Sequence, residues 1–141
     1  MSFNLQSGKT FEETVETLFK VMGYNTKPKT VLHTRSAHIS AVMHHPKGKQ
    51  KLLIECQSNV EAVGIQAVQQ FCSKVAHARE KAEADTGVLI STTGFSEEAV
   101  AWCTSNCSFV KLKTYSQVIS RTSNIRKLLR KFHRHQTHEA S

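Results

Sequence analysis

The chain has 141 residues, of which 19 are Lys or Arg and 11 are Asp or Glu, so its formal charge is +8. This length fits one domain, and a chain with 39% hydrophobic and 21% charged residues is not disordered throughout. Its apolar runs are far shorter than the roughly 20 residues of a membrane span, the N-terminus lacks the apolar core of a secretory signal, and the four cysteines do not make a disulfide scaffold. We therefore expect an intracellular protein with reduced cysteines and no membrane partner.

Both kinds of charge are unevenly distributed. Ten of the acidic residues are Glu and only Asp85 is Asp, which nearly excludes a mechanism that needs two aspartates. Residues 1–120 contain 13 Lys or Arg residues and 10 acidic residues. Residues 121–141 contain six Lys or Arg residues and one acidic residue. The sequence therefore predicts a domain over residues 1–120, followed by a basic segment over residues 121–141. Such a segment either attracts phosphates or is a solvated tail.

The first predicted element is a helix near the N-terminus. Apolar residues recur on one helical face at Phe11, Val15, Leu18, Phe19 and Met22. Ser7 or Thr10 is placed to cap the start of this helix, and Gly23 is placed to end it. The Lys-Pro-Lys stretch around Pro28 must then be non-helical.

Two strands are predicted next, from His38 to Met43 and from Lys51 to Gln57. Between them, residues 46–49 read Pro-Lys-Gly-Lys, which is typical of a turn. The middle of the second strand is too apolar to be exposed. The two strands therefore predict an antiparallel hairpin with a buried face.

The second half of the chain alternates helices and strands. A long helix is predicted over about residues 63–83, a buried strand over residues 86–91, a helix capped by Ser96, and a strand over residues 109–112. A final amphipathic basic helix is indicated by the apolar positions Ile125, Leu128, Leu129 and Phe132. The order αβββαβαβ predicts an α/β fold with a mixed sheet, helices on both faces and a C-terminal basic helix.

Several short motifs, taken together, resemble one known family. They are Gly8-x-x-Phe11-Glu12, Gly23-Tyr24, Ile54-Glu55-Cys56-Gln57 at the end of the hairpin, Val63-Gly64, and the stretch from Gly87 to Ala99. This combination is similar to the Mrr-type restriction endonuclease domain, which belongs to the superfamily with the PD-(D/E)xK nuclease fold. The resemblance runs from about Gly8 to Leu112 and implies a restriction-endonuclease-like mixed sheet.

The resemblance also implies a chemistry, namely metal-dependent hydrolysis of DNA phosphodiesters. In such nucleases an aspartate of the first hairpin strand and an acid of the second hold divalent cations, and a helix glutamate assists. A lysine two residues after the strand acid orients or activates the attacking water. Matched residue by residue, Glu55 is the strand acid and Glu12 the helix glutamate. The positions of the aspartate and of the lysine hold His38 and Gln57.

These two departures weaken the case for catalysis. No Asp or Glu lies between Glu16 and Glu55 to replace the aspartate. In some members of the superfamily the lysine function has moved to the following helix, which points here to Lys74. Glu55 and His38 remain the candidate metal ligands, although imidazole prefers softer ions than Mg²⁺. From the residues alone, Glu55 is either a site residue or the partner of a Lys or Arg, such as Lys51, in an ordinary salt bridge.

We therefore expect a DNA-binding domain whose nuclease centre is lost or altered, and which recognises duplex or branched DNA. The expected DNA contacts are Lys74, Arg126, Lys127, Arg130 and Lys131. One alternative is an active endonuclease that uses Glu55, Glu12, His38 and Gln57 or Lys74 with Mg²⁺ or Mn²⁺; otherwise no cofactor is expected. The other alternative is a protein-interaction or sensor domain that keeps only the fold. The sequence leaves undecided whether the chain forms a homodimer.

Overall fold

The computed structural model describes residues 10–30, 37–124, 127 and 130. Its elements, in chain order, are α1 (Phe11–Val21), β1 (Asn25–Thr30), β2 (Ala37–His45), β3 (Gly48–Gln57), α2 (Ile65–Glu80), β4 (Thr86–Ser91), α3 (Glu97–Asn106) and β5 (Val110–Thr114). This order matches αβββαβαβ and confirms the α/β class, and its first strand β1 contains the stretch around Pro28 that was predicted only to be non-helical. Across these ranges no helix is both long and apolar enough to cross a membrane.

The strands form one five-stranded sheet whose spatial order follows the sequence, β1-β2-β3-β4-β5. The pairs β1–β2 and β2–β3 are antiparallel, whereas the pairs β3–β4 and β4–β5 are parallel. The predicted mixed sheet is therefore confirmed. The β2–β3 hairpin is longer than predicted. Its pairing continues to His45 and Gly48 around a tight turn at Pro46 and Lys47, where Gly48 adopts a φ of 143° that favours glycine.

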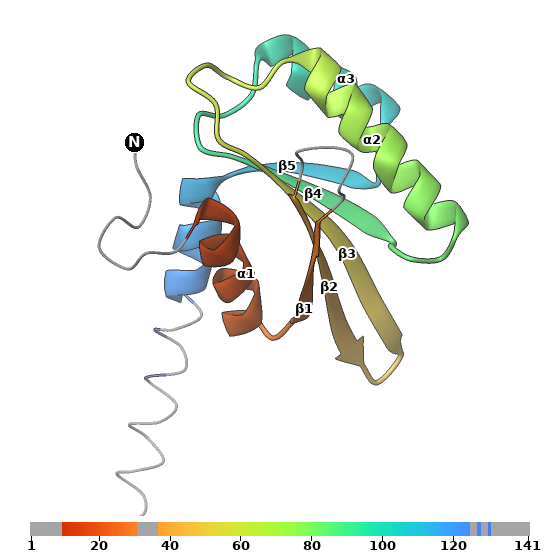
Figure 1. Cartoon of the computed structure of the whole chain (residues 1–141), viewed down its shortest axis with the longest axis vertical. Helices are drawn as coiled ribbons and strands as arrows, with labels where there is room; N and C mark the ends of the chain where they lie inside the picture. Colours follow the sequence, from red (N-terminus) through yellow and green to blue (C-terminus); the bar gives the residue numbers. More distant parts are fainter. Residues whose placement is uncertain (1–9, 31–36, 125–126, 128–129, 131–141) are drawn as a thin grey trace, which may run out of the picture.

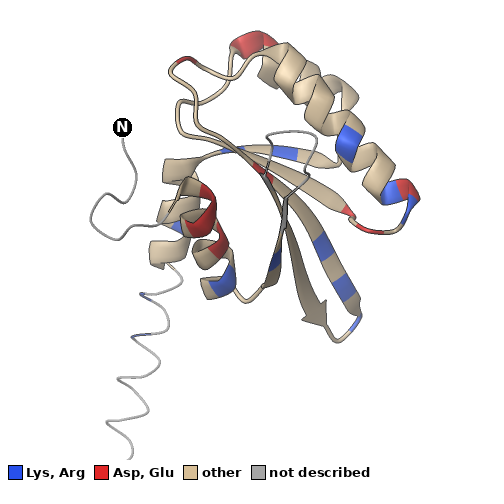
Figure 2. Cartoon of the chain, viewed as in Figure 1, with Lys and Arg blue, Asp and Glu red and all other residues tan. Residues whose placement is uncertain are grey.

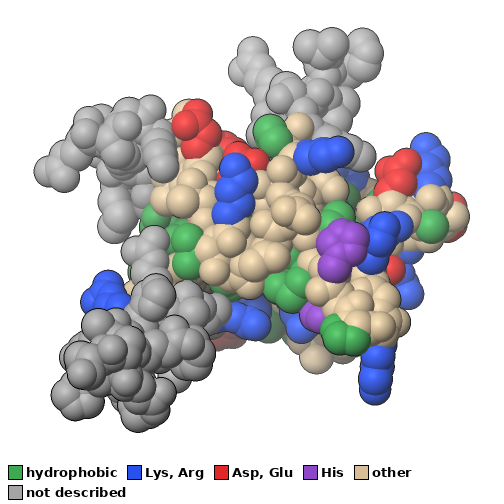
Figure 3. Space-filling view, turned by 90° about the horizontal axis from the view of Figure 1, so that it is seen from below, with side chains coloured by type: hydrophobic (Ala, Val, Ile, Leu, Met, Phe, Trp, Pro, Cys, Tyr) green, Lys and Arg blue, Asp and Glu red, His purple; other side chains and the backbone are tan. Residues whose placement is uncertain are grey.

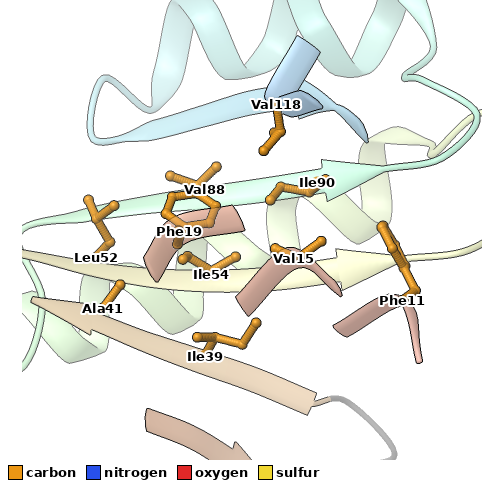
Figure 4. Packing of buried hydrophobic residues seen from close by; sticks show 10 residues of the cluster. All are labelled: Phe11, Val15, Phe19, Ile39, Ala41, Leu52, Ile54, Val88, Ile90 and Val118. Carbon is orange, nitrogen blue, oxygen red and sulfur yellow. The ribbon is translucent and has the colours of Figure 1, made fainter. Parts of the chain in front are cut away.

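Helices cover both faces of the sheet (Figure 1). On one face α1 packs together with a helix formed by residues 115–124, and on the other face lie α2 and α3. The buried cluster on the α1 side contains Phe11, Val15, Phe19, Ile39, Ala41, Leu52, Ile54, Val88, Ile90 and Val118 (Figure 4). The cluster on the α2 side contains Val63, Val68, Phe71, Cys72, Val75, Leu89, Ala99, Cys103, Cys107 and Val110.

Side-chain caps fix where α1 and α3 begin. The Oγ1 atom of Thr10 accepts a hydrogen bond from the Glu13 N–H at 3.1 Å, and the Oγ of Ser96 accepts one from the Ala99 N–H at 3.1 Å. Each bond satisfies an N–H that lacks a partner within its helix. The predicted caps are therefore confirmed, with Thr10 rather than Ser7 at the start of α1.

The helix over residues 115–124 was not among the predicted elements. It follows β5 without a loop, because the Thr114 Oγ1 accepts from the Gln117 N–H at 3.2 Å while the Gln117 Oε1 accepts from the Thr114 N–H at 2.8 Å. This reciprocal capping box is the sequence signal that identifies the helix. Val118 and Thr122 are buried, and Tyr115 packs edge-on against Phe11 with ring centroids 5.4 Å apart.

The predicted basic helix from Ile125 to Phe132 lies outside the described residues, apart from Lys127 and Arg130. Both of these positions are helical and exposed. The predicted domain boundary at residue 120 falls within the helix over residues 115–124 and stays a prediction.

Candidate functional site

Glu55 lies near the carboxyl end of β3, the central strand, and is only 3% exposed. Its neighbours Ile54 and Cys56 face α1 and belong to or pack on the apolar cluster of that side. Because side chains alternate along a strand, Glu55 and Gln57 face α2 instead. On the adjacent strand β2, the residue directly opposite Glu55 is His38. The hairpin register therefore brings the two candidate site positions side by side.

Three side chains converge on the Glu55 carboxylate. The Oε1 atom lies 2.9 Å from Nε2 of His38 and 2.9 Å from Nζ of Lys74, which is on α2. The Oε2 atom accepts a hydrogen bond from Nε2 of Gln57 at 3.1 Å. Both carboxylate oxygens are therefore occupied by groups of the protein itself. The ordinary salt bridge to Lys51 does not form, because the Lys51 ammonium donates to the Ala82 carbonyl at 3.0 Å.

His38 is buried, and its ring lies close to the Glu55 carboxylate, but the geometry of this contact is poor for a hydrogen bond. Its Nε2 atom is at ion-pair distance from the carboxylate, yet it makes no hydrogen bond of good geometry with any described group. A buried ring nitrogen without a well-directed partner is costly. The contact between His38 and Glu55 is therefore close packing of two polar groups rather than a strong directed bond.

The surroundings of Glu55 favour its ionised form. Burial alone raises the pKa of the carboxyl, but the contacts from His38, Lys74 and Gln57, together with the charge of Lys74, lower it to about 2. Contacts that stabilise the charged form thus outweigh desolvation. At neutral pH Glu55 is a carboxylate held against an ammonium.

Glu12 does not join this group. It lies in the first turn of α1, on the opposite face of the sheet, and its charge acts together with burial to raise the pKa of Cys56. Cys56 packs on the α1 cluster, whereas Glu55 faces α2. The sequence prediction that Glu12 assists Glu55 is not reflected in a shared contact.

Two polar contacts near Glu55 were not anticipated. The Nδ2 atom of Asn59 donates to Oε1 of Gln57 at 3.4 Å, which extends the polar chain from Glu55 into the β3–α2 loop. At the end of β4, the Oγ of the fully buried Ser91 accepts from the N–H groups of Thr93 and Gly94 at 3.1 and 3.0 Å. The alternating pattern Glu55-x-Gln57-x-Asn59 could have indicated the first contact, since these positions share one side of an extended chain.

The β3–α2 loop is tied to the β4–α3 loop. The Thr93 hydroxyl donates to the Glu61 carbonyl at 2.7 Å, and the Val63 N–H donates to the Gly94 carbonyl at 2.9 Å. Val60 at the tip of the first loop is 99% exposed, while Val63 is buried. These loops lie at the carboxyl ends of the parallel strands, which is where ligands bind in α/β sheets.

The donor atoms around Glu55 do not fit a dedicated Mg²⁺ site. Mg²⁺ requires octahedral oxygen coordination and is usually held by one or two carboxylates that are free to bind it. Here the Glu55 oxygens face an imidazole, an ammonium and an amide. Nowhere in the described ranges do three or more His, Cys, Asp or Glu side chains form a group that could hold a metal ion.

Acidic and basic residues are unevenly distributed over the described surface, although they occur together on α1 and at the end of α2. Figure 2 shows acidic residues at the starts of α1 and α3 and on the β3–α2 loop, and basic residues along the β2–β3 hairpin, on β5 and at the end of α2. The exposed hairpin end carries His44, His45, Lys47 and Lys49. In the view from below, basic side chains are spread over the surface, and histidine side chains lie beside some of them (Figure 3).

The candidate DNA contacts fall into two groups. Lys74 is half-buried against Glu55, whereas Lys127 and Arg130 are exposed. Arg126 and Lys131 lie outside the described residues. The structure thus does not bring Lys74 and the C-terminal cations together within the part of the chain it describes.

A restriction endonuclease family model, Mrr_cat, matches residues 4–122, which is most of the chain. The chain belongs to the Mrr_cat restriction endonuclease family. The match covers all eight numbered elements and the site around Glu55. A search of the curated proteins gave no match.

Two solved structures support the fold of this Mrr_cat domain. EndoMS in its apo form is 16% identical, with a TM-score of 0.54, and the match covers 77% of this chain and 46% of that one. AF1548, described as a protein of unknown function, is 21% identical, with a TM-score of 0.55 over 73% of this chain and 55% of that one. The Mrr_cat domain therefore spans about half the length of these structures. At such identities the likeness shows the restriction-endonuclease-like fold alone.

Proposed function

We propose that this Mrr_cat domain binds DNA, duplex or branched, without cleaving it by the metal-dependent reaction of its family. The observation that carries the proposal is the enclosure of Glu55 by His38 and Lys74, both at 2.9 Å. A carboxylate neutralised by a protein ammonium is a poor ligand for a cation that must compete for the same oxygens. The family supports DNA as the partner, because its model is described as a restriction endonuclease.

The charge distribution indicates where DNA contacts belong. The first turns of α1 and α3 carry acidic residues, which repel phosphates. The exposed cations Lys127 and Arg130 lie on the C-terminal side instead. We therefore assign phosphate contacts to this C-terminal region, and no hydrolytic step to Glu55.

The first experiment measures binding. A labelled 30-base-pair duplex and a four-way junction are titrated with the full chain over a range of salt, and anisotropy is recorded. We expect binding that weakens with salt, with a log–log slope that falls by about 0.9 for each phosphate contact removed. A double change, Lys127→Glu with Arg130→Glu, should weaken binding and flatten the slope.

The matched control is Lys111→Glu with Lys113→Glu, which alters charge equally at exposed positions of β5. These changes should leave DNA affinity nearly unaltered. A truncation should end after residue 124 rather than 120, because Thr122 is buried and its hydroxyl donates to the Val118 carbonyl. Absence of binding to either DNA at low salt would exclude the proposal.

The second experiment tests cleavage. Supercoiled plasmid is incubated with the protein and Mg²⁺ or Mn²⁺, and nicking is scored on a gel. We expect the wild-type protein to nick no more plasmid than a Glu55→Gln preparation does. Glu13→Gln, at an exposed acid of α1, is the control.

One observation favours a second function, that of an active endonuclease. Lys74 places an ammonium beside the strand acid, which is the pairing that the nuclease chemistry uses. Nicking by the wild-type protein that is lost in Glu55→Gln and kept in Glu13→Gln would establish this second function and exclude the first.

A further inference from the structure

The open edge of the sheet at β5 has backbone groups available for pairing. Strand β5 is last in the strand order and pairs only with β4 among the described strands. The Phe109 carbonyl accepts from the Gly87 N–H at 2.8 Å, so Phe109 directs its backbone groups toward β4. Backbone groups alternate in direction along a strand, and Val110 and Leu112 therefore direct theirs toward the open edge. The Val110 carbonyl receives only a weak contact from the Cys103 thiol at 3.7 Å.

A groove of about 280 Å³ with both polar and apolar lining lies beside this edge, between α3 and β5. Its lining residues are Val100, Cys103, Thr104, Cys107, Ser108, Val110 and Leu112. Val100, on α3, is 44% exposed. Side chains of a strand added next to β5 would point alternately into this groove and away from it.

Two lysines occupy the other face of the same strand. Lys111 and Lys113 are exposed and alternate with Val110 and Leu112. They lie about 7 Å apart, the repeat of alternate residues in a strand. Figure 2 shows these two basic positions on β5. A strand added at this edge would place its own alternate side chains opposite the two ammonium groups.

We propose that the β5 edge binds an extended acidic segment of a partner protein, in which apolar and acidic residues alternate. The apolar side chains would enter the groove between α3 and β5, and the acidic side chains would face Lys111 and Lys113. Backbone pairing with the edge gives affinity, and the alternation gives specificity. The proposal is independent of DNA binding.

A second copy of this chain is a poorer occupant than an acidic segment. Pairing two β5 strands edge to edge would bring Lys111 and Lys113 of both copies together on one face. Like charges directly opposite each other across strands are destabilising. Edge lysines are a known protection against such pairing, and that protection does not act against a carboxylate.

The test uses the full chain and a synthetic fluorescein-labelled peptide of alternating valine and glutamate, eight residues long. Anisotropy is compared for this peptide, a version of scrambled order, and a version N-methylated at alternate residues, which cannot form the ladder. We expect the alternating peptide to bind at least tenfold more tightly than either of the other two. Equal binding of the N-methylated peptide would overturn the proposal.

Charge reversal on the protein provides the second arm. Lys111→Glu with Lys113→Glu should weaken binding of the glutamate peptide at least tenfold and favour a lysine version of it. Lys47→Glu with Lys49→Glu, two exposed lysines at the hairpin end, is the matched control and should change neither. Displacement of the peptide by duplex DNA, or a dimer in light scattering that the peptide dissociates, would assign the edge to DNA or to self-association and overturn the proposal.

Discussion

The two faces of β3 carry different kinds of residue, although they belong to the same ten-residue strand. Toward α1 the strand presents Leu52 and Ile54 to a closed apolar cluster, whereas toward α2 it ends in the polar pair Glu55 and Gln57. The first face holds the sheet to α1. The second face keeps a buried carboxylate that contributes little to packing. The comparison shows that one strand can separate apolar packing from polar contacts, so substitutions on one face need not disturb the other.

The largest expected effect is on the apolar face. Ile54→Ala removes a side chain that is fully buried, and the cavity left should lower the free energy of unfolding by about 2–5 kcal/mol. Urea unfolding followed by circular dichroism measures it. DNA binding by the remaining folded protein should be unaltered. If the free energy of unfolding fell by less than about 1 kcal/mol, the surrounding cluster would have collapsed to fill the space left at position 54.

Close packing on the α2 face gives the next effect. A Cβ added at Gly87 of β4 would lie 2.3 Å from Cγ2 of Val75 and 2.9 Å from Cε2 of Phe71. Gly87→Ala should therefore lower the free energy of unfolding by about 1–3 kcal/mol, because α2 must move away from the sheet. Gly64→Ala, where a Cβ would meet no atom within 4 Å, is the control without a clash, and its loss should be smaller and come only from replacing the N-cap glycine of α2. Equal effects of the two changes would contradict the expected clash.

The polar pair itself should respond more weakly. Lys74→Met removes the ammonium 2.9 Å from Glu55 and leaves a buried carboxylate with fewer partners. We expect a loss of about 1–2 kcal/mol, reduced because Lys74 is partly exposed to water. Thermal unfolding of this variant is compared with Lys49→Met at the exposed hairpin end. No difference between the two would show that Lys74 contributes nothing to the stability of the polar face.

A further prediction is a pH dependence confined to the polar face. The pKa of Glu55 is about 2 in the folded protein against an ordinary value of 4.5, so its ionisation stabilises the fold above pH 4.5. That contribution should disappear as the pH falls from about 4.5 to about 2. Unfolding free energies of the wild type and Glu55→Gln, measured across this window, should therefore converge at low pH. Parallel curves would show that Glu55 has no lowered pKa.

Much of the fold could be predicted because its local signals agree with one another. The spacing of Phe11, Val15 and Phe19 and the cap at Thr10 define α1 without any tertiary information. The strand over residues 86–91 was predicted with the observed bounds, since a short uninterrupted apolar run is typical of a strand buried on both faces. The helix over residues 115–124 was missed because its sequence is mostly polar and only Val118 and Thr122 are buried.

The candidate site was only partly predictable. The period of a strand places Glu55 and Gln57 on one face, and the hairpin register then pairs Glu55 with His38. Which helical cation reaches the carboxylate depends on how α2 is rotated and set against the sheet, and sequence spacing alone does not determine this. Lys74 was named through the family resemblance, and its contact with Glu55 spans 19 residues of sequence. Glu12 was named in the same way, and its part in the site stays a prediction.

The strand order has a consequence for how the chain forms during synthesis. Because the spatial order of the strands is their order in the sequence, each new strand adds to the outer edge of the sheet already made. Residues 31–36 connect β1 to β2 and residues 46–47 connect β2 to β3, so these antiparallel strands can pair before α2 has been translated. The parallel strands must wait for their connecting helices. Glu55 is thus placed beside His38 early, and Lys74 reaches it only when the helix that covers the growing sheet has been made.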